Sequence, residues 1–496
     1  MPAAVPRSAF KEAAIIIAVT IAAWLVHFTA PADQLDDDQL KPWGYVADIV
    51  LHGKWLVQTD YEGAFMSKPP LYPWLCALLA KAGLGVSPLA MYLPTGAAML
   101  GSALIAWHLS RRWFGSGLHA GLAVVLSTLV IKHLCLARTD ALFTFTIALT
   151  AAAAWRIWNR PGAVSWLMFW GAATLATMTK GPLGVVLGAG GLFAVLWERA
   201  SRPAEERPAL SWRWGWCLLG ALGFLVLVGG WFLLAVLDGG RGVIDRMIGR
   251  ELVGHALRHD RTGEGVFSGW YKPPLYFLSR YVPWGIPSVV AMVRVVREPS
   301  PDPLARRAER FLFCWVAAGM LIFCIAPHQR PDLLLPLVPA AAILAAREVD
   351  HWLSFAAKSP RRGWQRVATG FWSFAVVFML FVGYMWHHVG RANKGEINET
   401  DAAFAVHDLL RGVPPERIHF ASDGWDTQFL WNVKRRAMTP AQAHTAFRGE
   451  EPVYVITAGD KQCLSAAELS GARVLFRVPK GNGTEDEFLV LTNAGQ

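Results

Sequence analysis

Residues 214–237 read WGWCLLGALGFLVLVGGWFLLAVL, a run of 24 residues without a single charged side chain. As an α-helix this run is about 36 Å long, which is more than the roughly 30 Å of a bilayer's hydrocarbon core. The composition of the whole chain also indicates a membrane protein, since 54% of the 496 residues are apolar and only 17% are charged. A soluble protein of this length carries about 25% charged residues. The sequence therefore predicts an α-helical polytopic membrane protein.

Further apolar runs of spanning length follow one another along the first 390 residues. We expect about eleven transmembrane helices, near 12–30, 89–110, 117–136, 141–158, 163–178, 181–197, 214–237, 276–296, 310–326, 331–347 and 367–388. The run 70–84 is too short to span with ease, and we expect an interfacial or re-entrant helix there. A tight turn is expected at 179–182, between the fifth and sixth spans. We interpret the first run as a retained span rather than a cleaved leader.

Lysine and arginine in the loops predict the orientation of the chain. Alternate loops are basic, near 111–112, 156–160, 199–213, 294–310 and 347–366, and basic loops stay in the cytoplasm. The N-terminus then lies in the cytoplasm, and an odd number of spans places the C-terminus outside. This pattern explains the net charge of +10 without a nucleic-acid partner.

The last hundred residues have a different pattern. Short β-rich runs at 417–422, 453–457, 474–478 and 488–492 alternate with helical patterns at 401–410 and 440–447. Gly, Pro and Asp separate these runs. We therefore expect two domains, a transmembrane domain over 1–390 and a small soluble α/β domain over 391–496 on the extracytoplasmic side.

Polar residues gather at span junctions that the predicted orientation places on the outer face. The junctions carry Asp36-Asp37-Asp38-Gln39, Lys68-Pro69-Pro70-Leu71-Tyr72, Arg138-Thr139-Asp140, Lys180-Gly181-Pro182 and His328-Gln329-Arg330-Pro331. Each cluster also has a simple structural explanation. Loop aspartates are often only solvated, Arg138 can form an ion pair with Asp140, and Lys180 can extend its ammonium group to the interface.

Taken together, the clusters favour chemistry on an anionic lipid headgroup. A carboxylate can act as general base for an acceptor hydroxyl group. Lysine and arginine can bind a phosphate and stabilise it as it leaves. A cationic clamp of this kind can take the role that a metal ion plays elsewhere.

The ordered set of motifs resembles the C-type membrane glycosyltransferases, which include the protein O-mannosyltransferases and the lipid A aminoarabinose transferase. The resemblance covers about residues 10–350, and each motif stands at its span junction. The matching segments are Asp38-Gln39, Gly53-Lys54-Trp55-Leu56, Lys68-Pro69-Pro70-Leu71-Tyr72-Pro73-Trp74-Leu75, Ala137-Arg138-Thr139-Asp140, Thr179-Lys180-Gly181-Pro182, Tyr281-Val282-Pro283-Trp284 and Arg330-Pro331-Asp332-Leu333-Leu334-Leu335-Pro336.

This resemblance implies the reaction and its partners. The donor is a sugar on a polyprenyl monophosphate, and transfer to an acceptor (lipid A, a glycan or a protein) proceeds with inversion on the extracytoplasmic side of a bacterial inner membrane. Asp38 matches the first acid of the loop pair and Asp140 the second-loop Asp, so both are expected to act in catalysis. The lipid phosphate and the sugar are expected to be bound by the remaining matched or neighbouring residues, which are Lys68, Arg330, Lys180, Arg138, Arg258 and Tyr72.

Two departures from the family pattern bear on the site. Gln39 replaces the second acid of the usual Asp-Glu pair, so Asp37 or Asp38 is expected to act as the base. Ser67 stands where an acid precedes the Lys-Pro pair in the aminoarabinose transferase, so we predict no metal and no other cofactor. Two alternatives stay open at this point. The chain can be a transporter or flippase of lipid-linked sugars, or a catalytically degenerate binding homologue.

Overall fold

A computed structural model of the chain describes residues 7–28, 37–60, 63–203, 205, 212–254, 269–358, 370, 405–420, 440–449, 451–458, 472–479 and 486–494. The chain divides into two compact units. The first comprises Met1–His27, Ser67–Tyr72 and Tyr92–Gly383, and the second comprises Phe28–Met66, Pro73–Met91 and Tyr384–Gln496. Each unit is described here by itself.

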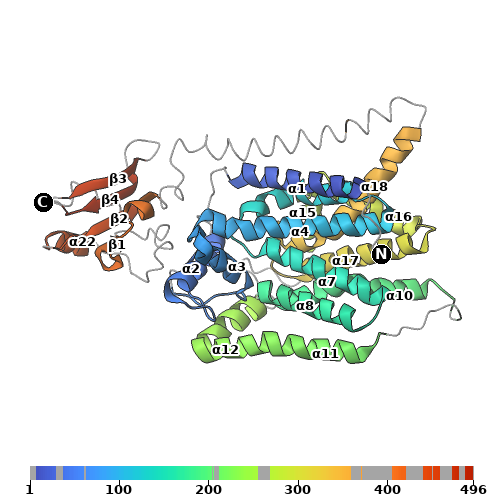
Figure 1. Ribbon diagram of the computed structural model, residues 1–496, viewed down its shortest axis with the longest axis horizontal. Helices are drawn as coiled ribbons and strands as arrows, with labels where there is room; N and C mark the ends of the chain where they lie inside the picture. The colour runs from blue at the N-terminus through green and yellow to red at the C-terminus, as the bar shows by residue number, and fades with distance from the viewer. Residues whose placement is uncertain are drawn as a thin grey trace. The chain divides into compact units, whose positions relative to one another are not determined.

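The first unit is a bundle of long helices (Figure 1). Its members are α1 (Arg7–Phe28), α4 (Pro88–Phe114), α5 (Leu118–Val125), α6 (Thr128–Ile131), η2 (Lys132–Cys135), α7 (Asp140–Asn159), α8 (Ala163–Lys180), α9 (Leu183–Ala189), η3 (Gly190–Leu192), α10 (Phe193–Ala200), α11 (Trp214–Phe224), η5 (Leu225–Gly229), α12 (Gly230–Gly239), α13 (Arg241–Ile244), η6 (Asp245–Gly254), α15 (Lys272–Arg280), α16 (Gly285–Arg297), α17 (Pro303–Ile325), η7 (Pro331–Leu337) and α18 (Val338–Lys358). Among the described residues, six helices are long and apolar enough to cross a membrane, or seven if a bent pair counts as one span. The polytopic α-helical fold expected from the sequence is confirmed.

Two expected spans bend or break, and a third, expected at 331–347, begins as the 3₁₀ helix η7 before α18. The run expected at 117–136 bends by 57° between α5 and α6. The run expected at 276–296 was wrong as one helix, because the chain leaves helical geometry between α15 and α16. Pro283 has no amide hydrogen to continue the helix there. The side chains of Tyr281 and Trp284 are buried at this break and donate to the carbonyl oxygens of Ala123 and Leu126, at 3.2 and 2.5 Å.

The span expected at 367–388 lies outside the described residues, apart from Gly370, as does the domain boundary at 390/391. The predicted turn at 179–182 is present, since α8 ends at Lys180 and α9 begins at Leu183. Small residues allow the helices around this turn to pack closely. Gly188 faces Thr150 of α7, and Gly191 faces Phe311 of α17, where an added Cβ would lie about 2.5 Å from the neighbouring side chain in each case.

The end of the bundle where α7 begins and α8 ends is called the site end below. The opposite end holds several ion pairs buried among the helices. Glu198 at the end of α10 accepts from Arg202, Arg306 and Arg310, at 2.8, 3.4 and 2.5 Å. Glu348 of α18 accepts from Arg294 of α16 at 2.9 Å. These pairs tie together the helix ends that carry the basic loops.

The second unit contains α2 (Asp37–His52), the part of the helix expected at 70–84 that begins at Pro73, and a small sheet. The helix runs as α3 (Leu71–Leu79) and continues as a π-helical turn, η1 (Ala80–Leu84). The four strands are β1 (Ile418–Phe420), β2 (Tyr454–Ala458), β3 (Arg473–Pro479) and β4 (Asp486–Thr492), in the order β1-β2-β4-β3. Only β1 and β2 are parallel. All four strands and α22 (Pro440–Phe447) lie where the sequence predicts them.

Two small cores pack on the sheet of the second unit. One is built from Val406, Leu410, Ile418, Phe420, Ile456 and Val490, and the other from Phe447, Val453, Val455, Leu489 and Leu491. Neighbouring residues of β2 and β4 belong to different cores because successive side chains of a strand point to opposite faces. The sheet is therefore covered on both faces, as in an α/β domain.

Candidate functional site

The centre of the candidate site is an ion pair between two helix ends. Asp140 is the first residue of α7, and Lys180 is the last residue of α8. The two helices pack against each other as a hairpin, so the start of one lies beside the end of the other. The ammonium group of Lys180 donates a hydrogen bond to the buried carboxylate of Asp140. A charge at this depth is stable only when it is paired or exposed, and here it is paired.

Gly181 makes this arrangement possible. Its φ of +96° and ψ of −179° belong to a region that only glycine adopts readily. The amide of Gly181 donates to the carbonyl oxygen of Thr177 at 2.8 Å, which closes the last turn of α8. The chain then reverses into α9, and Lys180 stays at the helix end with its side chain toward α7. Its ammonium group lies 5.9 Å from the centre of the Phe143 ring.

Two further basic residues lie close to Asp140. Lys68 and His133 are near enough to interact electrostatically with its carboxylate. Lys68 precedes the two prolines that lead into α3, and it is half-buried. His133 is buried in η2, where its Nδ1 lies 2.8 Å from the carbonyl oxygen of Leu129. Asp140 is therefore surrounded by three groups that can carry a positive charge.

A second carboxylate, that of Asp332 in η7, lies close to another set of basic groups. Its side chain lies 2.5 Å from Nζ of Lys132, 3.4 Å from Nη1 of Arg138 and 3.6 Å from Nε2 of His133. Asp332 and Asp140 are also close enough to interact electrostatically. The bend between α5 and α6 produces this contact, because it leads η2 across the site end beside η7. The two carboxylates thus belong to one charged cluster.

The structure corrects one pairing expected from the sequence. Arg138 was expected to form an ion pair with Asp140, two residues further along the chain. Instead Arg138 contacts Asp332, and Asp140 pairs with Lys180. Asp140 begins α7, so its side chain is directed by the helix toward α8, whereas Arg138 precedes the helix. The explanation of Lys180 as a lysine that only extends to the interface is also wrong.

The remaining predicted residues are placed as follows. Tyr72 is buried in the first unit, and Arg330 precedes η7 with an exposed side chain. Asp37 and Asp38 begin α2 in the second unit. Their side chains lie outside the described residues, as do Arg258 and its whole segment.

Lys132, His133 and Asp332 belong to the cluster but were not singled out from the sequence. Asp332 stood inside the quoted motif Arg330-Pro331-Asp332, and an acid at the start of an apolar segment is a signal that could have marked it. Lys132 and His133 lie inside the run 117–136, which was interpreted as one continuous span. Two polar residues near the end of that run were the available sign of the bend.

The cations of the cluster are groups that can bind an anionic ligand. Around the two carboxylates, the described residues bring together the cations Lys68, Lys132, Arg138 and Lys180. These cations are partly buried, where their interaction with an anion is screened less than in water. Among the described residues, no group of three His, Cys, Asp or Glu side chains is placed to hold a metal ion.

Residues 67–231 match the sequence profile of the dolichyl-phosphate-mannose-protein mannosyltransferase family. The likeness to this mannosyltransferase family is confined to the segment 67–231. The mannosyltransferase-family segment contains Lys68, the 132–140 stretch and Lys180, so most of the charged cluster belongs to it. Asp37, Asp38, Arg330 and Asp332 lie outside the matched segment.

Solved structures show the fold of the chain. ArnT from Cupriavidus metallidurans bound to undecaprenyl phosphate superimposes with a TM-score of 0.68, over 97% of this chain and 98% of that one, at 14% identity. The same protein in the apo state gives 0.66 over 98% of both chains, at 15% identity. The chain therefore has the ArnT-like fold of C-type glycosyltransferases, as the resemblance predicted.

An uncharacterized protein of Aquifex aeolicus (strain VF5) is 26% identical over 296 residues. The match covers 58% of this chain and 54% of that protein, so the chain spans about half the length of this relative.

Proposed function

We propose that this protein transfers a sugar from a polyprenyl monophosphate to an acceptor hydroxyl group at the extracytoplasmic face of the membrane, with inversion at the anomeric carbon. The cluster of cations around Asp140 and Asp332 carries the proposal. The cluster lies at one end of the bundle, and the arginine-rich helix ends lie at the other. Because basic loops stay in the cytoplasm, the end that holds the cluster is predicted to face outward. The fold supports it, because ArnT of the same fold has been crystallised with undecaprenyl phosphate.

The cations of the cluster bind the lipid phosphate in this proposal. In this proposal Lys68 and Arg330 contact the phosphate oxygens, with Arg138 and Lys180 next to them and Arg258 in reserve. The two carboxylates hold their cations in position, since Asp140 accepts from Lys180 and Asp332 lies beside Arg138. Positive groups that are already in place stabilise the charge that grows on the leaving phosphate without further reorganisation.

In this proposal a carboxylate of the first loop acts as the general base. Asp140 already accepts a hydrogen bond from Lys180, which stabilises its anion and makes it a weaker base. Asp38, or Asp37 beside it, takes the proton of the acceptor hydroxyl group. The acceptor oxygen then forms a bond to the anomeric carbon from the face opposite to the carrier. The bond between that carbon and the phosphate oxygen breaks, and the polyprenyl phosphate leaves with the electron pair.

The test is a transfer assay with the full-length protein in lipid nanodiscs. A panel of polyprenyl-phosphate sugars is offered with lipid A, glycan and peptide acceptors, and release of polyprenyl phosphate is measured. We expect release by the wild type and a loss of at least about a hundred-fold with Asp38→Asn or Lys68→Ala, the size expected for a missing base or charge stabiliser. Lys54→Ala is the control, because this half-exposed lysine lies in the same loop and contacts Asp48 at 3.6 Å.

A different result would favour the alternative function. Movement of the intact lipid-linked sugar across the bilayer of proteoliposomes, with no release of polyprenyl phosphate from any donor, would identify a transporter. Binding of the donor without either activity would identify a degenerate homologue.

A further inference from the structure

His133 is a buried residue of the charged cluster to which the proposed function assigns no role. It lies in η2, and its side chain is 1% exposed. Its Nδ1 lies 2.8 Å from the carbonyl oxygen of Leu129, one helical turn earlier in the chain. A carbonyl oxygen only accepts hydrogen bonds, so Nδ1 carries a hydrogen and donates it. The ring therefore has a fixed hydrogen on Nδ1 and a variable one on Nε2.

The other ring nitrogen of His133 faces the carboxylate of Asp332. Nε2 lies 3.6 Å from Oδ1 of Asp332, which is too far for a hydrogen bond, and within the described residues this buried nitrogen has no hydrogen-bond partner. In a neutral ring with its hydrogen on Nδ1, Nε2 presents a lone pair to the carboxylate, and the two repel each other. In a protonated ring, Nε2 carries a hydrogen that the carboxylate attracts. The orientation of the ring thus suits the charged form better than the neutral one.

The charges around His133 oppose one another. Among the described residues, its electrostatic partners are Asp332 of η7, Asp140 of α7 and Lys132 of its own helix. The two carboxylates favour the protonated ring, whereas Lys132 and the loss of water on burial disfavour it. Lys132 and Arg138 also contact Asp332, at 2.5 and 3.4 Å, and compete with His133 for its charge. An anion that binds these two cations therefore shifts the balance toward the protonated ring, because it adds a negative charge and weakens their hold on Asp332.

We propose that His133 is a positioning residue that couples binding of the donor's phosphate to uptake of one proton. Nε2 takes this proton from the solvent, and the imidazolium ring then holds Asp332 in place of Lys132 and Arg138, which turn toward the phosphate. The proposal rests on the proposed function and adds a regulation of its site. Coupling between two binding events is reciprocal, so the protonated ring also strengthens phosphate binding. The affinity for the donor should therefore fall as the pH rises through the titration of His133.

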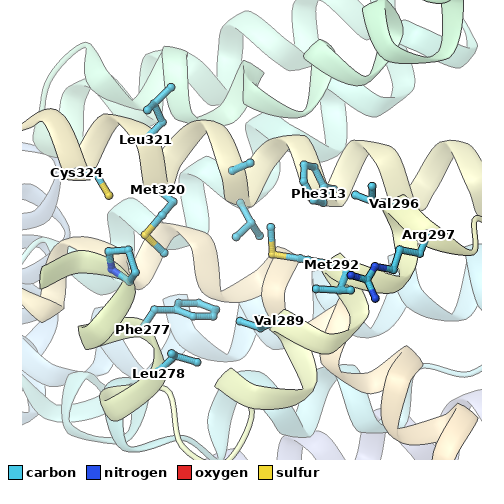
Figure 2. Close-up of a pocket in the computed structure, with 14 residues that line it drawn as sticks. Phe277, Leu278, Val289, Met292, Val296, Arg297, Phe313, Met320, Leu321 and Cys324 are labelled. Carbon is cyan, nitrogen blue, oxygen red and sulfur yellow. The ribbon is translucent and has the colours of Figure 1, made fainter. Parts of the chain in front are cut away.

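The apolar groove between α15, α16 and α17 does not supply this pH dependence. It has a volume of about 770 Å³ and is lined by side chains such as Phe277, Met292 and Met320 (Figure 2). The described residues that line it include no histidine and no carboxylate, and the charged residue among them is Arg297. Arginine keeps its charge at any pH near neutral. A pH effect on binding in this range must therefore come from elsewhere in the protein, as the proposal expects of His133.

Binding is measured with the full-length protein in nanodiscs, from about pH 5.5 to about pH 8.5, a range that brackets the ordinary imidazole pKa. The probe is the methyl diester of undecaprenyl phosphate, because a phosphodiester keeps a single negative charge over this range. A phosphate monoester would itself gain charge there, with a second pKa of about 6. Isothermal titration calorimetry in two buffers of different ionisation enthalpy gives the dissociation constant and the number of protons taken up. For the wild type we expect an affinity at least about five-fold higher at the acid end, with net uptake of up to about one proton.

A substitution by asparagine separates the charge of His133 from its packing. His133→Asn places an amide N–H at the position of Nδ1, so the bond to Leu129 is kept and the titrating nitrogen is lost. We expect its affinity to vary less than about two-fold over the pH range and to stay close to the wild-type value at the alkaline end. His119→Asn is the matched control, because His119 pairs with Asp350 at 2.5 Å and is not part of the cluster, so the wild-type profile should be kept. His133→Gln repeats the test if His133→Asn does not fold.

Several outcomes would overturn the role of His133. They are a wild-type affinity that is independent of pH, a wild-type pH profile in both His133 variants, and an equal loss of affinity at every pH in His133→Asn, which would indicate packing alone. Absence of diester binding to the wild type at any pH would overturn it as well. Sugar transfer in the transfer assay with a pH-independent affinity would leave the proposed function standing without His133. Conversely, the expected profile in a wild type that transfers no sugar would overturn the proposed function and leave the coupling in place.

Discussion

Lys180 donates a hydrogen bond to Asp140 across the packed ends of α8 and α7, and both side chains are largely buried. The pair joins residues that are 40 positions apart, and it gives the first prediction. Breaking one side of a buried ion pair costs about 3–5 kcal/mol, because the other charge stays buried without its partner.

Lys180→Met or Asp140→Asn should therefore lower the thermal stability in detergent as well as sugar transfer. The double variant Asp140→Asn/Lys180→Gln keeps a neutral hydrogen bond, so we expect it to recover most of the stability and none of the transfer. Differential scanning fluorimetry with the transfer assay separates the two effects. Full activity in the double variant would show that the pair only holds the helices together.

Asp332 is predicted to organise the cations beside it. Asp332→Asn removes the charge that Lys132, Arg138 and His133 share, and these groups then repel one another. We expect weaker binding of the polyprenyl-phosphate donor by about ten-fold, corresponding to roughly 1.4 kcal/mol, because the cations are no longer held in place. Asp332→Glu keeps the charge and should restore part of the affinity. Donor KM in the transfer assay is the measurement, and an unchanged KM for Asp332→Asn would exclude the positioning role.

Gly181 is predicted to be required for its backbone conformation alone. A Cβ at this position would meet nothing within 4 Å, yet the φ of +96° is strained for any other residue. Gly181→Ala should cost about 1–3 kcal/mol of folding free energy and should displace Lys180 from Asp140. Gly171→Ala in the middle of α8 is the matched control, since a Cβ there also meets nothing within 4 Å and the helix tolerates it. Equal melting temperatures for the two variants would contradict this reasoning.

Glu198 should matter for stability and not for catalysis. Its carboxylate, 6% exposed, compensates three arginines at the end of the bundle opposite to the site. Glu198→Gln should destabilise the protein by about 3–5 kcal/mol, with an unchanged donor KM for the folded fraction. Glu298, which is 71% exposed and contacts Arg294 at 2.8 Å, is the control, and Glu298→Gln should cost less than about 1 kcal/mol.

The C-terminal sheet should lose stability in acid through His407. Burial lowers the pKa of this imidazole, and Asp408 only partly opposes the effect. The folded pKa lies below the unfolded value of about 6.5, so the contribution to stability is present above that pH and is lost as the pH falls through the folded pKa. Hydrogen exchange of β1 and β2 amides, corrected for its intrinsic pH dependence, should show falling protection below about pH 6.5. In His407→Gln the protection should change less over the same range.

Much of this fold is predictable from local patterns. The run 214–237 becomes α11, η5 and α12 because lipid tolerates no other backbone conformation for so long an apolar segment. The four C-terminal strands appear at their expected positions, because short β-rich runs separated by Gly, Pro and Asp have few other conformations. The breaks at 126–127 and 281–284 were not predicted, since apolar content is the same on both sides of each break.

The sequence by itself determined which residues could take part in the site, because a charged side chain at a span junction is costly unless it is exposed, paired or used. That cost alone marks Lys68, Asp140 and Lys180 as candidates. Only the tertiary structure decided the partners, placing Lys180 on Asp140 and Arg138 on Asp332, which is 194 residues away. Helix periodicity has no information about contacts between distant segments. Such contacts arise when close packing around small residues brings α7, α8 and η7 together at one end of the bundle.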